Sequence, residues 1–155
     1  MVEAVLRPAT DDDAAIVWRL RNADDVRKAS FDPTPIELDA HRRWFHERLR
    51  DGSTRLYLVL DPARDPVGFV RFDVDDDRAE IAVALTAAAR GRGVGRAAIR
   101  QGSLAVLGEL ARVSRVVARV KPGNAASLGA FRGAGFREAG RDDDVVELVF
   151  ARDDA

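Results

Sequence analysis

A glycine-rich segment bounded by arginines is the part of this sequence best suited to chemistry. It reads Arg90, Gly91, Arg92, Gly93, Val94, Gly95 and Arg96. Glycines at alternate positions let backbone N–H groups come close to a ligand, because no Cβ atom stands in the way. An apolar, helix-like run follows directly, and the N-terminus of a helix attracts anions. The segment is therefore predicted to hold a phosphate or diphosphate group.

Two common phosphate-binding loops do not fit this spacing. A P-loop closes with Lys-Ser or Lys-Thr, whereas the residues in that place are Arg96 and Ala97. A dinucleotide-binding loop has two residues between its second and third glycines and lies early in a βαβ unit. Here a single residue separates Gly93 from Gly95, and three strand-like segments come first. The anion is therefore expected to belong to another cofactor.

A second motif follows after a helix-like and a strand-like run. It comprises Asn124, Ser127, Phe131, Gly135 and Phe136. Together, the frame Arg90-x-x-Gly93-x-Gly95 and this second motif resemble the GNAT superfamily of N-acetyltransferases, over roughly residues 79–150. The resemblance implies that the first motif binds the pyrophosphate of acetyl-CoA. It also implies that Asn124, Ser127 and Phe131 lie along the pantetheine arm, although Asn124 is equally suited to cap a helix.

Acetyl transfer needs a polarised thioester carbonyl, a deprotonated amine and a departing thiolate. By the resemblance, backbone N–H groups of Val83 and Leu85 bind the carbonyl oxygen, and Glu80 accepts the proton of the amine, often through water. Strand alternation places the Glu80 side chain on the face opposite to Val83 and Leu85, so a solvated strand residue is the alternative. The family commonly has a tyrosine where this sequence has Phe131, which cannot donate a proton to the thiolate.

The N-terminal part supplies the residues expected to meet the acceptor. Arg21, Asn22, His41 and Trp44 resemble the GNAT subgroup that acetylates nucleotide-linked amino sugars, as in pseudaminic acid biosynthesis. At helical spacing His41, Trp44 and Phe45 share one face, which would line a sugar and nucleobase pocket by stacking. The alternative is that the aromatic side chains anchor the helix to the core while His41 bonds locally. This alternative is preferred for Phe45.

These motifs indicate an enzyme that transfers an acetyl group from acetyl-CoA directly to a primary amine of a small molecule. A nucleotide-linked amino sugar is the first expected acceptor, and a protein N-terminal amine or another small amine is the alternative. Because of Phe131, a non-catalytic acyl-CoA-binding module is the alternative function. A homodimer is compatible with the resemblance.

The elements that must position these residues follow from periodicity and turn residues. Strands are predicted at residues 2–6, 55–60, 67–74, 79–85, 115–120, 136–138 and 145–150. Helices are predicted at residues 11–22, 38–50, 93–110 and 124–134, the first with a capping box from Thr10 and Asp13. The resemblance implies an α/β fold in which about four helices flank a central, mostly antiparallel sheet. It forms a single domain over residues 1–151, followed by a short tail over 152–155.

Composition narrows the class of protein. With 155 residues, 46% of them hydrophobic and 33% charged, the chain is expected to fold as one globular domain. A net charge of −1 argues against a nucleic-acid partner, and no apolar run is long enough for a membrane span. The absence of cysteine excludes disulfides and a cysteine nucleophile, and two histidines five residues apart do not make a metal site. A cytoplasmic location is expected.

Overall fold

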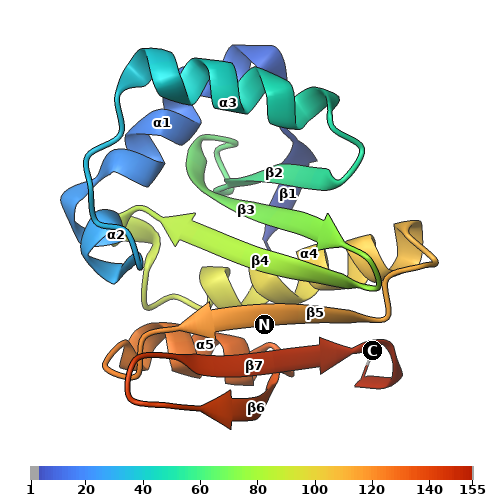
Figure 1. Ribbon diagram of the computed structural model, residues 1–155. Helices are drawn as coiled ribbons and strands as arrows, with labels where there is room; N and C mark the ends of the chain where they lie inside the picture. Colours follow the sequence, from blue (N-terminus) through green and yellow to red (C-terminus); the bar gives the residue numbers. More distant parts are fainter. Residues whose placement is uncertain (1–3, 155) are drawn as a thin grey trace.

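The computed structural model describes residues 4–154, which form one seven-stranded sheet with the order β1-β2-β3-β4-β5-β7-β6 (Figure 1). The strands are β1 (Val5–Pro8), β2 (Thr54–Leu60), β3 (Pro66–Asp75), β4 (Arg78–Leu85), β5 (Arg115–Val120), β6 (Arg137–Arg141) and β7 (Val146–Ala151). The α-helices are α1 (Ala14–Asn22), α2 (Asp24–Ala29), α3 (Leu38–Arg50), α4 (Val94–Glu109) and α5 (Ala125–Gly133). Neighbouring strands are antiparallel except β4 and β5, which are parallel. The predicted α/β fold is confirmed, with one α-helix more than expected.

Helices cover both faces of the sheet, and each face has its own hydrophobic cluster. α1 and α3 pack on one face, and α4 and α5 pack on the other (Figure 1). Strand alternation divides the apolar side chains between the clusters: Val70 and Phe72 of β3 join the α4–α5 cluster, whereas Phe69 joins the α1–α3 cluster. Because the strands contribute to both clusters, the sheet is the shared middle layer of the domain.

The parallel pair in the middle of the sheet is short. β4 and β5 pair only over Arg78–Glu80 and Arg115–Val117, and beyond Glu80 they separate toward their C-terminal ends (Figure 1). β4 nevertheless stays paired with β3 as far as Leu85. Its C-terminal half therefore has a hydrogen-bonding partner on one side only, and a gap opens between β4 and β5.

The additional helix is α2, which the sequence analysis did not predict. It has six residues and none of them is buried, so it lacks the apolar periodicity that reveals a helix in a sequence. Asp24 and Asp25 stand in its first turn, and Arg27 and Lys28 stand in its last, an arrangement that suits the helix dipole. α2 is thus stabilised by the placement of its charges and by contacts with the rest of the chain, and not by buried side chains.

The other differences lie at the ends of elements. The predicted first helix begins as a 3-10 turn, Asp11–Asp13, and the backbone N–H of Thr10 donates to the Asp13 carboxylate at 2.8 Å, as a capping box requires. The strand predicted at 136–138 extends to Arg141, while residues 2 and 3 of the first predicted strand lie outside the described residues. The expected tail contains a 3-10 turn, Arg152–Asp154, whose Arg152 guanidinium donates to the backbone carbonyl of Val113.

Candidate functional site

The loop between β4 and α4 has the backbone shape that an anion-binding loop requires. Gly91 and Gly93 have φ angles of 74° and 81°, in the left-handed region that glycine adopts without strain. Gly93 is the N-cap of α4 and Val94 its first residue, so the N–H groups of the first turn point out of the helix without intrahelical partners. The exposed side chains of Arg92 and Arg96 add positive charge there. A diphosphate would fit this loop by its charge and its need for N–H donors.

Two glycines allow the chain to close tightly around Leu85 at the end of β4. A Cβ atom added to Gly68 of β3 would lie 2.4 Å from the carbonyl oxygen of Ala84 and 2.5 Å from Leu85 Cδ2. A Cβ atom added to Gly95 of α4 would lie 3.1 Å from Leu85 Cδ1. The lack of side chains at Gly68 and Gly95 therefore determines how closely β3 and α4 approach the end of β4.

The backbone N–H groups of Val83 and Leu85 point toward the gap between β4 and β5. Thr86, directly after β4, donates its N–H to the carbonyl oxygen of Val67 in β3 at 2.8 Å. Because successive N–H groups of a strand point in opposite directions, those of Leu85 and Val83 face away from β3, toward the side where β5 has separated. Both N–H groups could therefore donate to a hydrogen-bond acceptor placed in the gap.

Arg90 lies over the same gap and is already engaged. Its Nη2 donates to the carbonyl oxygen of Leu85 at 2.8 Å, and its Nη1 forms an ion pair with Asp25 of α2. The guanidinium holds the pKa of the Asp25 carboxyl below its usual value, mainly through this hydrogen bond. On the other side of the gap, Lys121 Nζ donates to the backbone carbonyl of Lys28 at 2.9 Å. α2 is therefore fastened to the chain at the ends of both β4 and β5.

The second predicted motif begins at the C-terminal end of β5, at the same edge of the sheet as the glycine loop. Asn124 is the N-cap of α5, and its Oδ1 accepts the N–H of Ser127 at 3.1 Å. Phe131 is 3% exposed and packs edge-to-face on Phe136, with 5.2 Å between ring centroids. Asn124 and Ser127 thus lie at the helix terminus near the gap, whereas Phe131 belongs to the α4–α5 cluster.

Glu80 occupies the apex of the gap. It is the last residue of β4 that pairs with β5, where it stands opposite Val117. Ile81 belongs to the α4–α5 cluster and Ala84 to the α1–α3 cluster, so alternation places the Glu80 side chain on the α1–α3 face, as the sequence predicted. Its partner on β3 is Asp73. A carboxylate at this point can take a proton from an amine that enters from the α1–α3 face.

Three of the four residues predicted for the acceptor site lie in contact with one another. The Arg21 guanidinium is 4.1 Å from the centroid of the Trp44 ring, and its Nη1 donates to His41 Nδ1 at 3.0 Å. His41 Nε2 in turn donates to the backbone carbonyl of Ala14 at 2.8 Å, and Phe45 is fully buried. His41 thus forms the local hydrogen bond, and Phe45 has the place in the core, that the sequence analysis gave as the alternative to a substrate-binding role.

Asn22, the fourth residue, is used within the fold. Its Oδ1 accepts the backbone N–H of Ile36 at 2.8 Å, and this bond ties the segment between α2 and α3 to the end of α1. Trp18 supports the same segment, because its indole N–H donates to the carbonyl oxygen of Ile36 at 2.7 Å. The α1–α3 side of the gap is thereby held in place by side chains of α1.

Burial shapes the charges of this cluster. It lowers the pKa of His41 to about 4, so the imidazole is neutral at pH 7 and accepts the hydrogen bond from Arg21. Burial also lowers the pKa of Arg21 to about 10, and the positive charge of Arg71 acts in the same direction while Asp73 opposes it. Arg21 remains protonated at pH 7, as a partly desolvated cation.

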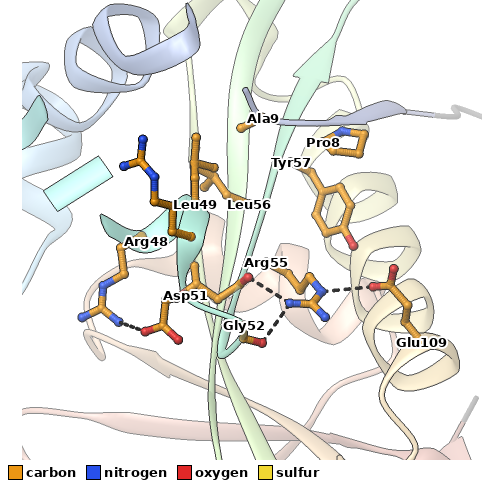
Figure 2. A pocket seen from close by; sticks show the side chains of 12 residues that line it. Pro8, Ala9, Arg48, Leu49, Asp51, Gly52, Arg55, Leu56, Tyr57 and Glu109 are labelled. Carbon is orange, nitrogen blue, oxygen red and sulfur yellow. Dashed lines mark hydrogen bonds and ion pairs between the residues drawn. The ribbon is translucent and has the colours of Figure 1, made fainter. Parts of the chain in front are cut away.

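The chain's one tyrosine lies far from the gap. Tyr57 of β2 lines a pocket of about 280 Å³ near the C-terminal ends of α3 and α4, and burial raises the pKa of its hydroxyl. Figure 2 shows this pocket, in which the Arg55 guanidinium bonds to the Gly52 carbonyl oxygen and to the Glu109 carboxylate. β2 is separated from the gap by β3 and β4, so Tyr57 cannot protonate a thiolate there.

The two histidines have separate hydrogen-bond partners. His46 Nδ1 contacts the Asp11 carboxylate at 2.7 Å, whereas His41 is buried beneath Arg21. Within residues 4–154, no group of three or more metal-ligating side chains occurs. Across the same residues, no helix combines the length and the apolar character needed to cross a membrane.

A glycine loop at a helix N-terminus and strand N–H groups that face a gap in the sheet lie side by side at the end of β4. Coenzyme A-dependent acyltransferases are the class of enzyme that needs both at one place. Residues 4–137 match the acetyltransferase (GNAT) domain, and the chain belongs to this family. The predicted family and its type of activity, acetyl-CoA-dependent N-acetyl transfer, are confirmed.

Solved acetyltransferases share the fold at low sequence identity. Spermidine N-acetyltransferase from Vibrio cholerae, solved with CoA and spermine, has a TM-score of 0.85 and 18% identity over 98% of this chain and 97% of that chain. An aminoglycoside acetyltransferase solved with coenzyme A and kanamycin has a TM-score of 0.80 and 19% identity over 98% and 96%. A structure assigned as a phosphinothricin N-acetyltransferase has 0.78 and 23% over 96% and 98%. Comparison with curated protein sequences gave no match.

Arg71 and Asp73, which the sequence analysis did not single out, lie next to the predicted residues Trp44 and Glu80. Arg71 and Asp73 form an ion pair at 3.0 Å, and the Arg71 guanidinium is 5.2 Å from the Trp44 ring. Their signal was present, because both charges interrupt an apolar strand at alternate positions, before a turn that pairs Asp73 with Glu80. Asp25 had no such signal, because nothing in the sequence links it to Arg90.

Proposed function

We propose that the acetyl-CoA diphosphate binds at the glycine loop and that its thioester lies in the gap between β4 and β5. The supporting observation is the gap itself, where β4 keeps free N–H groups next to the N-terminus of α4. Val83 and Leu85 would donate to the thioester carbonyl oxygen, and Asn124 and Ser127, at the N-terminus of α5, would contact the pantetheine arm. The α4–α5 side is thus the donor side, and the α1–α3 side is the acceptor side.

In the proposed reaction the amine attacks the thioester carbon directly, and no acyl-enzyme forms. Glu80 accepts a proton of the amine, directly or through water, as the C–N bond forms. The C–S bond then breaks, and the thiolate takes a proton from solvent. A free cysteine thiol has a pKa of about 8.5, so a thiolate is a weak enough base to leave without a general acid. The phenylalanine at position 131 is therefore compatible with turnover.

The proposed acceptor is a primary amine of a small molecule, bound near Arg21, His41 and Trp44. A nucleotide-linked amino sugar is the first candidate, because Arg21 and the Trp44 ring present a cation and a stacking surface. The structural neighbours are described with spermine, kanamycin and phosphinothricin, which makes polyamines, aminoglycosides and amino acids the other candidates.

Cofactor binding tests this proposal first. Gly93→Val should lower the affinity for CoA at least about tenfold, because valine cannot adopt the left-handed backbone that aims the N–H groups at the diphosphate. Isothermal titration calorimetry with CoA measures the change. The matched control is Gly108→Val, at a position of α4 where an added Cβ has open space. Wild-type protein that binds no CoA would refute the proposal.

Turnover separates the enzyme from a binding module. Release of CoA thiol can be followed with a thiol reagent without background, because the chain has no cysteine. We expect thiol release with at least one class of small amine. Tight CoA binding without turnover on any class would instead support the non-catalytic acyl-CoA-binding module.

A further inference from the structure

Arg21 is a cation that folding removes partly from water without a carboxylate partner. Among the described residues it forms no ion pair, and its one hydrogen bond goes to the neutral imidazole of His41. Its guanidinium also stacks on the Trp44 ring. The Asp73 carboxylate also stabilises the charge of Arg21, but it is already paired with Arg71. Desolvating a cation costs free energy that stacking, a neutral acceptor and this shared carboxylate offset only in part. The site therefore favours an added negative charge.

Arg71 brings a second guanidinium to the same indole ring. Its carbon atom Cζ is 5.2 Å from the centroid of Trp44, compared with 4.1 Å for Arg21. Its Nε donates to Asp73, and its two terminal nitrogens have no hydrogen-bond partner within residues 4–154. The side chain keeps 20% of its surface exposed, so a ligand can reach it. Two neighbouring guanidiniums repel each other, and a shared anion turns that repulsion into attraction.

These cations lie next to the proposed reaction centre. Arg71 pairs with Ala82 of β4, which is adjacent to Val83, whose N–H is proposed to bind the thioester carbonyl. Glu80 and Asp73 form the next row of the same face, roughly 7 Å along the strands. A group held by Arg21 and Arg71 could therefore belong to the same small molecule as an amine that approaches Glu80.

We propose that Arg21 and Arg71 bind an anionic group of the acceptor, either a carboxylate close to the acetylated amine or a phosphate elsewhere on the same small molecule. This inference rests on the proposed function and specifies its acceptor. Amino acids and phosphorylated amino sugars meet the requirement. A polyamine does not, because its additional ammonium groups would face two guanidiniums.

Paired acceptors test the preference for an anion. Glucosamine 6-phosphate is compared with glucosamine, and L-leucine with isopentylamine, so that each pair differs in one anionic group. For at least one pair we expect kcat/KM to favour the anionic member at least about tenfold, the effect of one charge-assisted contact. The pair that shows the preference distinguishes phosphate from carboxylate. Arg21→Gln should abolish the preference, whereas Arg19→Gln, an exposed position of α1, should preserve it.

A binding measurement tests the anion site independently of turnover. Inorganic phosphate is titrated into CoA-saturated protein and followed by tryptophan fluorescence, because Trp44 touches both guanidiniums. Wild type and Arg19→Gln should show saturable binding, and Arg21→Gln and Arg71→Gln should lose it while their melting temperatures show that they are folded. Such binding without turnover on any amine would support the anion site and refute the proposed function. Acetylation of both members of each pair at equal kcat/KM would refute the anion site and leave the proposed function intact.

Discussion

His41 shows how burial sets the charge state of one residue in the acceptor site. Its ring is 1% exposed, accepts a hydrogen bond from Arg21 and donates one to Ala14. A protonated ring could not accept from Arg21 and would place a third positive charge beside Arg21 and Arg71. The pKa of about 4 therefore keeps the cluster intact at neutral pH.

The same residue predicts a pH dependence of stability. The pKa of an unfolded histidine is about 6.5, whereas that of folded His41 is about 4. Between these values the unfolded chain binds the additional proton, so the free energy of unfolding should fall as the pH drops from about 6.5 toward 4. Urea unfolding at pH 7.0 and 4.5 measures the loss. His41→Gln should show a smaller loss than wild type and than the control His46→Gln, and equal losses in all three would contradict this prediction.

Individual site residues differed in how far the sequence revealed them. The place of Glu80 in β4 was predictable, because it is a charge within an apolar strand that precedes a recognisable loop, whereas its role as a base stays a prediction. The Arg21–Trp44 contact was predictable only as a shared region, because the two residues lie on different helices and no spacing rule joins them. The pairing of Arg71 with that cluster required the three-dimensional arrangement of β3, α1 and α3.

At the scale of elements, α2 connects the two strands that separate. Asp25 binds Arg90 beyond the end of β4, and the Lys28 carbonyl binds Lys121 beyond the end of β5. Arg90 is also expected to meet the acetyl-CoA diphosphate. The carboxylate of Asp25 and the diphosphate would therefore compete for one guanidinium.

This competition predicts that a loss of charge on α2 strengthens cofactor binding. Asp25→Asn should lower the Kd for CoA about two- to fivefold, because an exposed ion pair is worth about 0.5–1 kcal/mol. Calorimetric titration with CoA gives the change. Asp24→Asn removes the neighbouring carboxylate, which pairs with Arg27, and should leave the Kd unchanged. Weaker or unaltered binding in Asp25→Asn would show that Arg90 does not exchange partners.

Sequence patterns predicted the helices and strands that contribute buried residues to the core. They did not predict a helix without buried residues or the point at which two strands diverge. β4 and α3 have their expected bounds to within one residue, because β4 is an apolar run between turns and the buried His41 and Phe45 of α3 stand at helical spacing. α2 has no buried residue, so no period exposed it. The early end of the β4–β5 pairing was likewise invisible, because it depends on where two strands diverge in space.

At the scale of the whole molecule, the two hydrophobic clusters are joined through shared strands. β3 contributes Phe69 to one and Phe72 to the other, and β4 contributes Ala84 and Ile81 in the same way. Loss of either helical layer would expose one face of these strands. The cluster on the opposite face would then be destabilised as well, because it is built on the same strands. The domain is therefore expected to unfold as one cooperative unit.

The positions of the tryptophans make this cooperativity measurable. The chain's two tryptophans, Trp18 and Trp44, lie in α1 and α3, so their fluorescence reports the acceptor-side layer, whereas far-UV circular dichroism reports all helices and strands. Urea titrations followed by the two methods should give the same midpoint. A lower midpoint by fluorescence would show that the α1–α3 layer unfolds separately.

Gly68 and Gly95 have a consequence for laboratory evolution of this enzyme. Gly68 in β3 and Gly95 in α4 both pack against Leu85. Because they have no side chains, inspection of the site does not mark them as functional. Substitutions at the acceptor residues can exchange one substrate for another, whereas a side chain at Gly68 moves the backbone that the donor thioester needs whatever the acceptor is. Libraries built to change acceptor specificity should therefore diversify α1, α3 and the partly exposed positions Arg71 and Asp73 of β3, and keep these two glycines fixed.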